Sequence, residues 1–363
     1  MNTPFNPVIQ LVEKSSLSAI HLQDIEFGKQ MTDHMFVAQY ENGQWHSPSI
    51  MPLQKLHLHP GILGLHYGQT VFEGMKAFRQ SADSVALFRP RDHAARFNKS
   101  LERMSMPKLP EEWFVSGIEL LLQFDHQWVP ALPGYSLYIR PFAFASEAKL
   151  GMKVSDQYLF VVIASPVGPY YEKPLRVKVE REFSRAAQDG TGYAKCGGNY
   201  GGSFYPMQKA RAQGFDQIIW TDSKEHKYID EAGTMNLMFV WDGKLVTPAI
   251  NPAILSGITR DSILKLASHM GVETEERKIS IEAVKDALSK GMISEAFGTG
   301  TAAVLSPLAH IDIEGEGFDL PELKEDSLAN RVKQELAAIR YGQSEDIFSW
   351  NSLITMPEMS DKL

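Results

Sequence analysis

Residues 190–202 read Gly190-Thr191-Gly192-Tyr193-Ala194-Lys195-Cys196-Gly197-Gly198-Asn199-Tyr200-Gly201-Gly202, so that six glycines surround one lysine and no other charged side chain. Glycines let the backbone approach a ligand closely, and apolar surroundings disfavour the ammonium form of a lysine. A neutral Lys195 amine is a nucleophile that can form a Schiff base. A flexible loop with an incidental lysine is the alternative that this stretch alone leaves open.

Helices and strands are expected on both sides of this stretch, from hydrophobic spacing and from the residues that begin and end helices. Before it, we expect strands at 34–41, 85–88, 136–141 and 158–164, a helix capped by Asp92 with Phe97, Leu101 and Met104 on one face, and a helix at 113–124. After it, we expect a helix at 205–213, a strand at 217–221, a hairpin at 236–247 turning at Asp242-Gly243, helices capped by Thr259 (260–270) and Ser280 (to Leu288), and a helix at 326–341.

A proline- and glycine-rich stretch, Ser165–Tyr171, interrupts any regular element and predicts a linker near residue 170. The length and the 44% hydrophobic content favour two domains with substantial cores. The sequence therefore predicts a mixed α and β chain with an N-terminal domain at 1–169 and a C-terminal domain at 170–363.

Composition excludes several classes of protein. The formal net charge is −8 and no block of basic residues is present, which argues against a nucleic-acid partner. The longest apolar runs, 159–169 and 296–308, are interrupted and shorter than the ~20 residues of a spanning helix, so no membrane segment is expected. The N-terminus lacks the pattern of a signal peptide, and the single cysteine, Cys196, suits the cytoplasm.

Motifs spread over nearly the whole chain resemble the branched-chain aminotransferases, which are pyridoxal-phosphate (PLP) enzymes of fold type IV. The matching pieces are Phe27-Gly28, Thr32-Asp33-His34-Met35, Leu65–Gln69, Phe72–Phe78, Tyr138–Pro141, Ser165–Tyr170, Lys195–Tyr200, Glu231–Asn236, Ile254–Arg260 and Phe297–Ala302. Each piece is only moderately specific, but their occurrence together and in order is strongly so. The resemblance implies a small N-terminal and a larger C-terminal domain, with the cofactor at their interface.

The resemblance also implies roles around the cofactor ring. Lys195 matches the lysine that holds PLP as a Schiff base and then moves the proton. Glu231 matches the acidic partner of the pyridine nitrogen, where a carboxylate keeps that nitrogen protonated. Tyr200 matches the tyrosine near the phenolic oxygen. An ordinary surface glutamate and a packed core tyrosine are the alternatives for the last two.

For the phosphate group, the resemblance points to Arg96, and Ile258 and Thr259 lie where a helix begins, so their amides offer an anion site. Thr301 would add a donor. Arg96 as an exposed helix arginine and Thr259 as a plain helix cap remain alternatives. The substrate pocket implied by the resemblance consists of Phe27, Tyr67, Phe72, Tyr138, Tyr170 and Ala302, with Thr234 near the substrate carboxylate and Arg140 for an acidic co-substrate. Core packing is the alternative for the aromatic members.

Three other patterns carry no prediction of a site. Gly298–Ala303 matches a dinucleotide fingerprint, but the strand-like residues after it, which we expect Pro307 to stop, do not open a helix. His57 and His59 on one expected strand face lack a third ligand, so no metal is assigned. The positions of the redox cysteine pair of some animal members hold Ala303 and Ser306, so thiol regulation of that kind is not expected.

The sequence thus predicts a ping-pong transamination in which leucine, isoleucine or valine donates its amino group to PLP and 2-oxoglutarate collects it as glutamate. The family also implies a homodimer in which the partner supplies pocket residues. A D-amino acid transaminase or an aminodeoxychorismate lyase of the same fold, and a non-catalytic PLP-binding protein, are the alternatives. The sequence does not indicate the preferred amino acid, the biosynthetic or catabolic direction, or assembly beyond a dimer.

Overall fold

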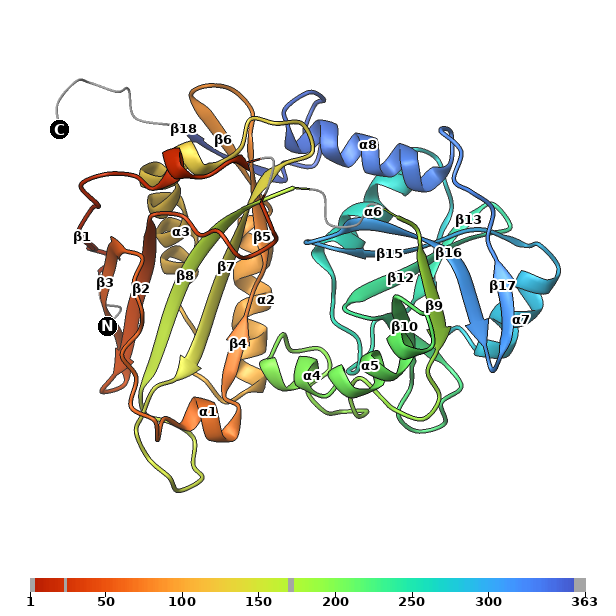
Figure 1. The fold of residues 1–363 in the computed structure, drawn as a ribbon, viewed down its shortest axis with the longest axis horizontal. Coiled ribbons are helices and arrows are strands. Elements are labelled where there is room, and N and C mark those ends of the chain that lie inside the picture. The colour runs from red at the N-terminus through yellow and green to blue at the C-terminus, as the bar shows by residue number, and fades with distance from the viewer. Residues whose placement is uncertain (1–3, 23–24, 169–172, 356–363) are drawn as a thin grey trace. The chain divides into compact units, whose positions relative to one another are not determined.

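The structure is a computed structural model that describes residues 4–22, 25–168 and 173–355. Contacts divide the described chain into two compact units (Figure 1). The first unit comprises the described residues up to 168 together with those from Ile339 onward, and the second unit comprises residues 173 to Ala338. The two sheets and surrounding helices confirm the mixed α and β fold.

The C-terminal residues 339–355 lie in the first unit, although the sequence analysis placed them in a domain running from 170 to the end. Strand β18 (Asn351–Thr355) pairs antiparallel with β6 (Ser84–Phe88) and extends the sheet of the first unit. The Tyr341 hydroxyl donates a 2.6 Å hydrogen bond to the Tyr135 carbonyl. No local sequence pattern predicts that residues 339–355 pair with the first unit, because strand pairing depends on residues far apart in the sequence.

The sheet of the first unit has the order β1-β3-β2-β8-β7-β5-β6-β18, with β4 paired to β7. Only β1 and β3 pair in parallel among these strands of the described chain. The remaining strands are β1 (Val8–Ile9), β2 (His34–Glu41), β3 (Gln44–Pro52), β4 (Thr70–Phe72), β5 (Met75–Arg79), β7 (Ser136–Ala145) and β8 (Tyr158–Val167). The strands expected at 34–41, 85–88, 136–141 and 158–164 are confirmed.

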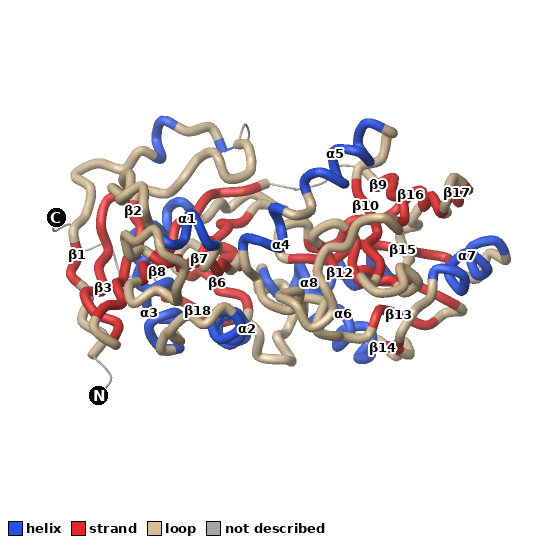
Figure 2. Tube along the Cα trace, turned by 90° about the horizontal axis from the view of Figure 1, so that it is seen from below, coloured by secondary structure: helices blue, strands red, loops and turns tan. Residues whose placement is uncertain are grey.

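Helices α2 (Pro90–Arg103) and α3 (Glu111–Asp125) cover one face of this sheet (Figure 2). Phe97 and Phe114 from these helices pack on the β8 side chain Phe160, with ring centroids 5.5 and 6.0 Å away.

The expectation that Asp92 caps α2 is wrong. Arg89, in a left-handed conformation, is the cap, while Asp92 lies in the first turn and accepts a 2.7 Å hydrogen bond from Arg89. Short helices η1 (Leu17–Ala19), α1 (Leu63–Tyr67) and η3 (His126–Trp128) complete the unit.

The sheet of the second unit has the order β11-β10-β9-β16-β15-β12-β13-β14, with β17 paired to β16. Strand β11 also pairs with β12, so the six strands from β11 along the sheet to β12 form a closed ring of paired strands. The strands are β9 (Leu175–Val179), β10 (Gln217–Thr221), β11 (Ile229–Ala232), β12 (Met235–Trp241), β13 (Lys244–Pro248), β14 (Thr274–Arg277), β15 (Ile293–Gly300), β16 (Val304–Ile313) and β17 (Glu316–Asp319). Their buried aliphatic residues form the main core of this unit.

The helices of the second unit are α4 (Gly197–Gly201), α5 (Phe204–Ala212), α6 (Ile258–His269), α7 (Ile281–Ser289) and α8 (Leu328–Arg340), the last of which runs into the first unit. The expected hairpin turn is confirmed, with positive φ angles at Asp242 and Gly243, and Ser280 caps α7 by accepting from the Ala283 amide. Thr259 is not the cap of α6, because Gly257 occupies that position and Thr259 lies in the first turn.

Two further expectations are wrong. Pro307 does not stop its strand: β16 runs through it to Ile313, and pairing with β9 begins only at Leu308, so Pro307 has a partner on one side. His57 and His59 lie in an irregular segment after β3, not on a strand.

Candidate active site

Lys195 lies in a loop that Asn199 holds closed. The Asn199 amide nitrogen donates to the Thr191 and Ala194 carbonyls at 2.8 and 2.9 Å, and its oxygen accepts from the Thr191 hydroxyl at 2.7 Å. The Lys195 amine donates a 2.8 Å hydrogen bond to the Tyr200 hydroxyl. The structure therefore fixes the predicted lysine and the predicted tyrosine side by side.

Gly192 explains part of the glycine content of this loop. A Cβ atom at Gly192 would lie 2.5 Å from the Cα and carbonyl oxygen of Ala253, so only glycine allows the two backbones to meet. The Tyr193 amide donates a 3.1 Å hydrogen bond to the Pro252 carbonyl. The segment that carries Lys195 thus rests directly on residues 252–253.

Glu231, on β11, is buried beside this loop. Its Oε1 accepts a 2.6 Å hydrogen bond from the Leu255 amide, and its Oε2 lies 3.3 Å from the Arg185 Nε. Burial raises the pKa of the Glu231 carboxyl, against the opposing charge of Arg185 and the Leu255 amide. The surface-glutamate alternative is excluded by this burial.

Arg185 is a site residue that the sequence analysis missed. One terminal nitrogen of its guanidinium donates to the Gly192 carbonyl at 2.7 Å and also to the Ala253 carbonyl. Arg185 therefore ties the Lys195 segment and residue 253 to Glu231. No signal in the sequence marks it, because it stands in an irregular stretch with charged residues nearby.

A small pocket in the second unit brings three predicted residues together: Tyr200, Glu231 and Thr234 line it. Lys195 joins this group through its hydrogen bond to Tyr200. The pocket is also lined by residues that were not predicted, namely Arg185, Asn199, Ser203, Gly233 and Leu255. An amine, a phenol and a buried carboxylate thus lie on neighbouring segments of this unit, and their chemistry suits a heteroaromatic aldehyde with a basic ring nitrogen.

The predicted anion ligands of this unit lie on neighbouring segments. Ile258 and Thr259 are buried in the first turn of α6, where amides point out of the helix start. Asn236 pairs with Glu231 across β11 and β12, and its amide donates to the Leu255 carbonyl at 2.9 Å, which fixes the approach to the helix. Thr301 and Ala302 form the turn between β15 and β16.

Arg96 is held on α2 of the first unit by a buried glutamate. Its Nε and one terminal nitrogen donate to the two oxygens of Glu73 at 2.7 and 2.8 Å, and His93 Nδ1 lies 2.9 Å from Glu73 Oε2. Burial would raise the pKa of the Glu73 carboxyl, but the Arg96 charge and these hydrogen bonds hold it well below its usual range. The exposed-arginine alternative for Arg96 is therefore wrong, since only 9% of its side chain is exposed.

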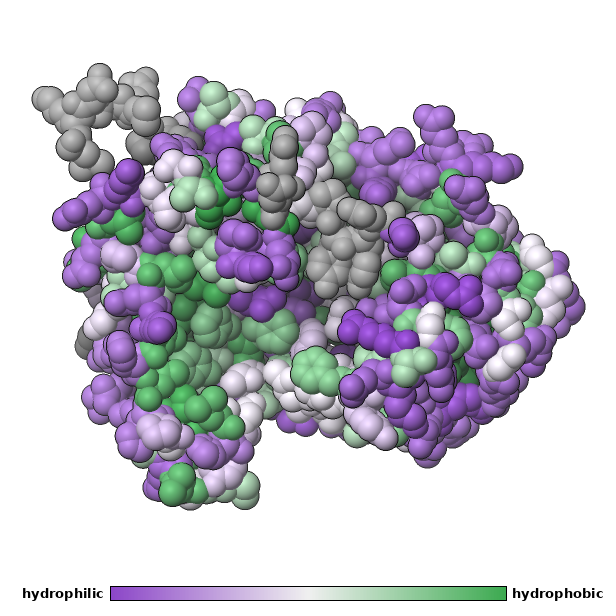
Figure 3. All heavy atoms as spheres, in the orientation of Figure 1, coloured by the Kyte–Doolittle hydropathy of each residue, from purple (hydrophilic) through white to green (hydrophobic). Residues whose placement is uncertain are grey.

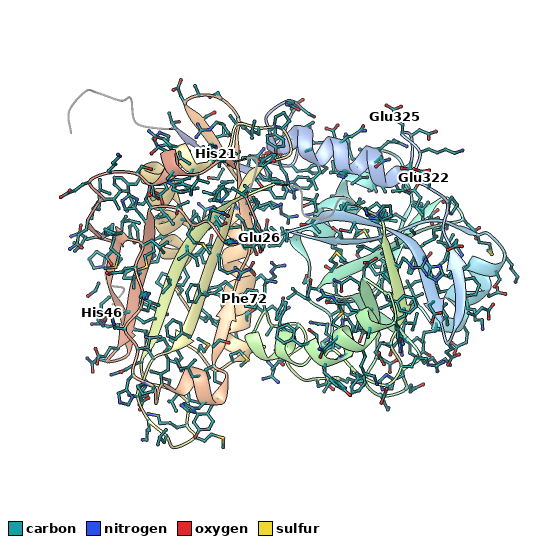
Figure 4. All side chains as sticks on the ribbon, viewed as in Figure 1. His21, Glu26, His46, Phe72, Glu322 and Glu325 are labelled. Carbon is teal, nitrogen blue, oxygen red and sulfur yellow. The ribbon has the colours of Figure 1, made fainter. Side chains whose placement is uncertain are left out.

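Four predicted pocket residues meet in the first unit. The Arg140 guanidinium lies over the rings of Phe72 and Tyr138, 4.9 and 5.2 Å from their centroids, and donates a 3.0 Å hydrogen bond to the Tyr138 hydroxyl. The Phe27 ring packs edge-on against Tyr138 at 5.1 Å. Figure 4 labels Phe72 at the end of β4.

Two aromatic predictions remain. The Tyr67 hydroxyl, on α1, donates to the Leu150 carbonyl. Tyr170 lies outside the described residues. Within the described ranges, no group of three or more His, Cys, Asp or Glu side chains is arranged to hold a metal ion, and no helix combines the length and apolar character needed to cross a membrane.

Comparisons with known proteins agree with one another. The model of the class IV amino-transferase family matches residues 70–311. Branched-chain-amino-acid aminotransferase 2 of Bacillus subtilis is 42% identical over 90% of this chain and 92% of its own length. The crystal structure of the Escherichia coli branched-chain amino acid aminotransferase superposes with a TM-score of 0.72 at 27% identity, covering 88% of this chain and 98% of the other. The T.th. enzyme complexed with N-(5′-phosphopyridoxyl)-L-glutamate gives a TM-score of 0.69 at 25% identity over 87% and 97%.

Proposed function

The chain belongs to the class IV aminotransferases, and on that premise we propose that it transfers the amino group of leucine, isoleucine or valine to 2-oxoglutarate, with PLP held by Lys195. The observation that carries the proposal is the 2.8 Å contact of the Lys195 amine with Tyr200 in a loop closed by Asn199, beside the pocket that holds Glu231. When bound, PLP supplies an aldehyde carbon that captures amines and a ring that stabilises negative charge on the substrate's α-carbon.

The residues of the second unit fit this cofactor in chemical type. Lys195 would hold the aldehyde and, when present as a free amine, would move a proton at the substrate's α-carbon. Tyr200 keeps the lysine oriented through its hydroxyl oxygen. Glu231 would serve as the carboxylate for the ring nitrogen, and the charge of Arg185 favours its ionised form against the effect of burial. Because burial alone disfavours the ionised carboxylate, that support is needed for Glu231 to hold a protonated ring nitrogen.

Candidate hydrogen-bond donors for a phosphate group lie within each unit, taken separately. The first-turn residues Ile258 and Thr259 offer the positive end of α6, and Thr301 offers a hydroxyl in the β15–β16 turn. Arg96 supplies a full positive charge, and its clamp on Glu73 fixes where that charge stands.

The substrate side chain would lie against the apolar cluster of the first unit. Phe27, Phe72 and Tyr138 provide an aromatic wall suited to branched aliphatic groups, while Arg140 provides the cation for the second carboxylate of glutamate. Thr234, Ala302, Tyr67 and Tyr170 are the other residues that the family resemblance assigns to the substrate. These side chains would thus accept the branched-chain donors by apolar contact and the acidic co-substrate by charge.

The proposed assembly is a homodimer. The sheet face of the first unit away from α2 and α3 is apolar, as the hydrophobic side chains gathered there in Figure 3 show. A groove of about 500 Å³ on this face is lined mainly by aliphatic and aromatic side chains, together with Thr70 and Arg140. Two of its lining residues, Leu58 and Leu65, are 39% and 71% exposed. An exposed apolar face of this kind is typical of an interface. The proposed location is the cytoplasm.

An absorption spectrum recorded before and after addition of L-leucine tests the proposed function. We expect the visible band of the lysine-bound cofactor to convert to that of the amine form, and 2-oxoglutarate to restore it. D-alanine and aminodeoxychorismate serve as donors for the two rival activities, and a protein that only binds PLP would show no conversion.

The variant Lys195→Ala should lose transamination, while the exposed Lys290→Ala should keep it. Borohydride reduction followed by peptide mapping should place the pyridoxyl group on Lys195. Label on another lysine, or a faster response to D-alanine than to L-leucine, would refute the proposal.

A further inference from the structure

A second cavity, of about 430 Å³, lies on the other side of β11 from the Glu231 pocket. Neighbouring residues of a strand point to opposite faces, so Glu231 lines one hollow and Asp230 the other. Tyr228, Ile250, Asn251, Pro252 and Lys278 also line this second hollow, hereafter the Asp230 cavity. Its volume is in the range of small-molecule sites.

Asp230 lies at the buried side of the cavity, where a hydrogen bond from Asn251 and the charge of Arg185 oppose the effect of burial on its carboxyl. Only 4% of the residue is exposed, and within the described part of the chain its carboxylate accepts one long hydrogen bond, 3.4 Å from the Asn251 amide nitrogen. The nearby Asp222, by contrast, accepts from the amides of Lys224, Glu225, Lys227 and Tyr228. Burial raises the pKa of the Asp230 carboxyl, and a cationic hydrogen-bond donor in the cavity would offset that desolvation.

Lys278 brings a positive charge to the same cavity. The Ile229 amide donates to the Ile279 carbonyl at 2.9 Å and Tyr228 bridges to Ser280, a register that sets Asp230 and Lys278 opposite each other. The Lys278 amine lies 3.5 Å from the centroid of the ring of Tyr228, which also lines the cavity, and this contact holds the cation beside it. Asp222, Lys224 and Glu225 also line the cavity. Backbone amides already occupy the Asp222 carboxylate, and Lys224 and Glu225 oppose each other in charge.

A buried carboxyl group, a lysine amine held over the Tyr228 ring and the apolar residues Ile250 and Pro252 match a molecule with an ammonium group, a carboxylate and a small aliphatic part. We propose that the Asp230 cavity binds an α-amino acid, with its ammonium group on Asp230, its carboxylate on Lys278 and its side chain against Ile250 and Pro252.

The wall of this cavity is shared with the Lys195 site. Pro252 accepts from the Tyr193 amide, Ala253 accepts from Arg185, and the Leu255 amide donates to Glu231. An occupied Asp230 cavity would therefore act on Glu231 and on the Lys195 loop through residues 251–255. This consequence for catalysis rests on the proposed function, whereas the binding site does not.

Binding of 2-methylalanine to the holoenzyme tests the site by calorimetry. This amino acid has no α-hydrogen and cannot be transaminated, and saturating 4-methylpentanoate, a leucine skeleton without the amino group, keeps it out of the substrate pocket. We expect one molecule bound per chain. Isobutyrate, which lacks the ammonium group, and isopropylamine, which lacks the carboxylate, should bind at least about tenfold more weakly, since each forfeits one charged contact.

Asp230→Asn and Lys278→Met should each weaken 2-methylalanine binding by about tenfold or more. Lys227→Met is the matched control, because Lys227 also stands over the Tyr228 ring, at 5.5 Å, but does not line the cavity, and it should change binding less than about twofold. No binding to the wild type, equal binding of isopropylamine, or unchanged binding in Lys278→Met would overturn the site. If Asp230→Asn does not fold, Lys278→Met and the single-group probes decide. None of these readouts needs transamination, so failure of the site and failure of the proposed function are distinguishable.

Discussion

Each unit buries one glutamate against one arginine, yet the two carboxylates are held very differently. Glu73 in the first unit is 0% exposed, receives both arms of Arg96 and lies against His93, and its pKa is held well below the usual range. Glu231 in the second unit is 3% exposed, has one amide and a single 3.3 Å ion pair with Arg185, and its pKa is raised. The first carboxylate holds two nitrogens of Arg96, whereas the second has fewer partners and a pKa shifted in the opposite direction.

Glu73→Gln should give the largest effect of four substitutions, a loss of about 3 to 5 kcal/mol in the free energy of unfolding at pH 7, because it leaves Arg96 buried without its counter-charge. A carboxyl group whose pKa is lowered in the folded state stabilises the fold when the pH is above its ordinary pKa, here 4.5. That contribution disappears as the pH falls. The gap between wild type and variant should therefore shrink below about pH 4.5, as measured by urea unfolding of the apoenzyme. A gap that stays constant with pH would contradict the assignment.

Glu231→Gln should lower kcat/KM by about a hundredfold to a thousandfold, the range for removal of one charge-stabilising group from an active site. Its effect on stability should have the opposite pH trend from that of Glu73→Gln. A carboxyl group whose pKa is raised in the folded state lowers stability once it ionises. The free energy of unfolding of the wild type should therefore rise relative to that of the variant as the pH falls toward 4.5. Parallel pH trends for the two variants would break the contrast between the units.

The sequence predicted the parts of the site that one continuous segment carries. Lys195 and Tyr200 are five residues apart, and the glycines around them reveal the loop that brings them together. It also predicted strands and helices whose periodicity is regular, and the Asp242-Gly243 turn. Arg185 and the clamp of Glu73 on Arg96 were not predicted, because a buried ion pair is a property of two distant segments. The return of residues 339–355 to the first sheet was missed for the same reason.

Arg185→Gln tests the difference between the two glutamates by changing the arginine that pairs with Glu231. Losing the charge should raise the pKa of Glu231 further, because Arg185 now opposes the effect of burial. The acid limb of the kcat/KM profile should move to higher pH, and kcat/KM at pH 7 should fall by about tenfold to a hundredfold.

Arg185→Lys is the matched control, since it keeps the charge but loses the fork that reaches Gly192 and Ala253. Its acid limb should stay near that of the wild type even where its stability is lower. An unmoved acid limb in Arg185→Gln would show that Arg185 only supports the loop.

Asn199→Ala should have the smallest effect, because it removes neutral hydrogen bonds and no charge. Its amide closes the loop from Thr191 to Ala194, and each such bond contributes about 1 kcal/mol. The loop should open locally more than the unit unfolds, so hydrogen exchange at 191–199 should accelerate by about tenfold while the unfolding midpoint of the apoenzyme moves little. Asn98→Ala, which removes a similar pair of loop contacts with Leu109 in the first unit, is the control and should leave exchange at 191–199 unchanged. Equal protection of residues 191–199 in Asn199→Ala and wild type would mean that the Lys195 loop is held by its packing on residues 252–253 instead.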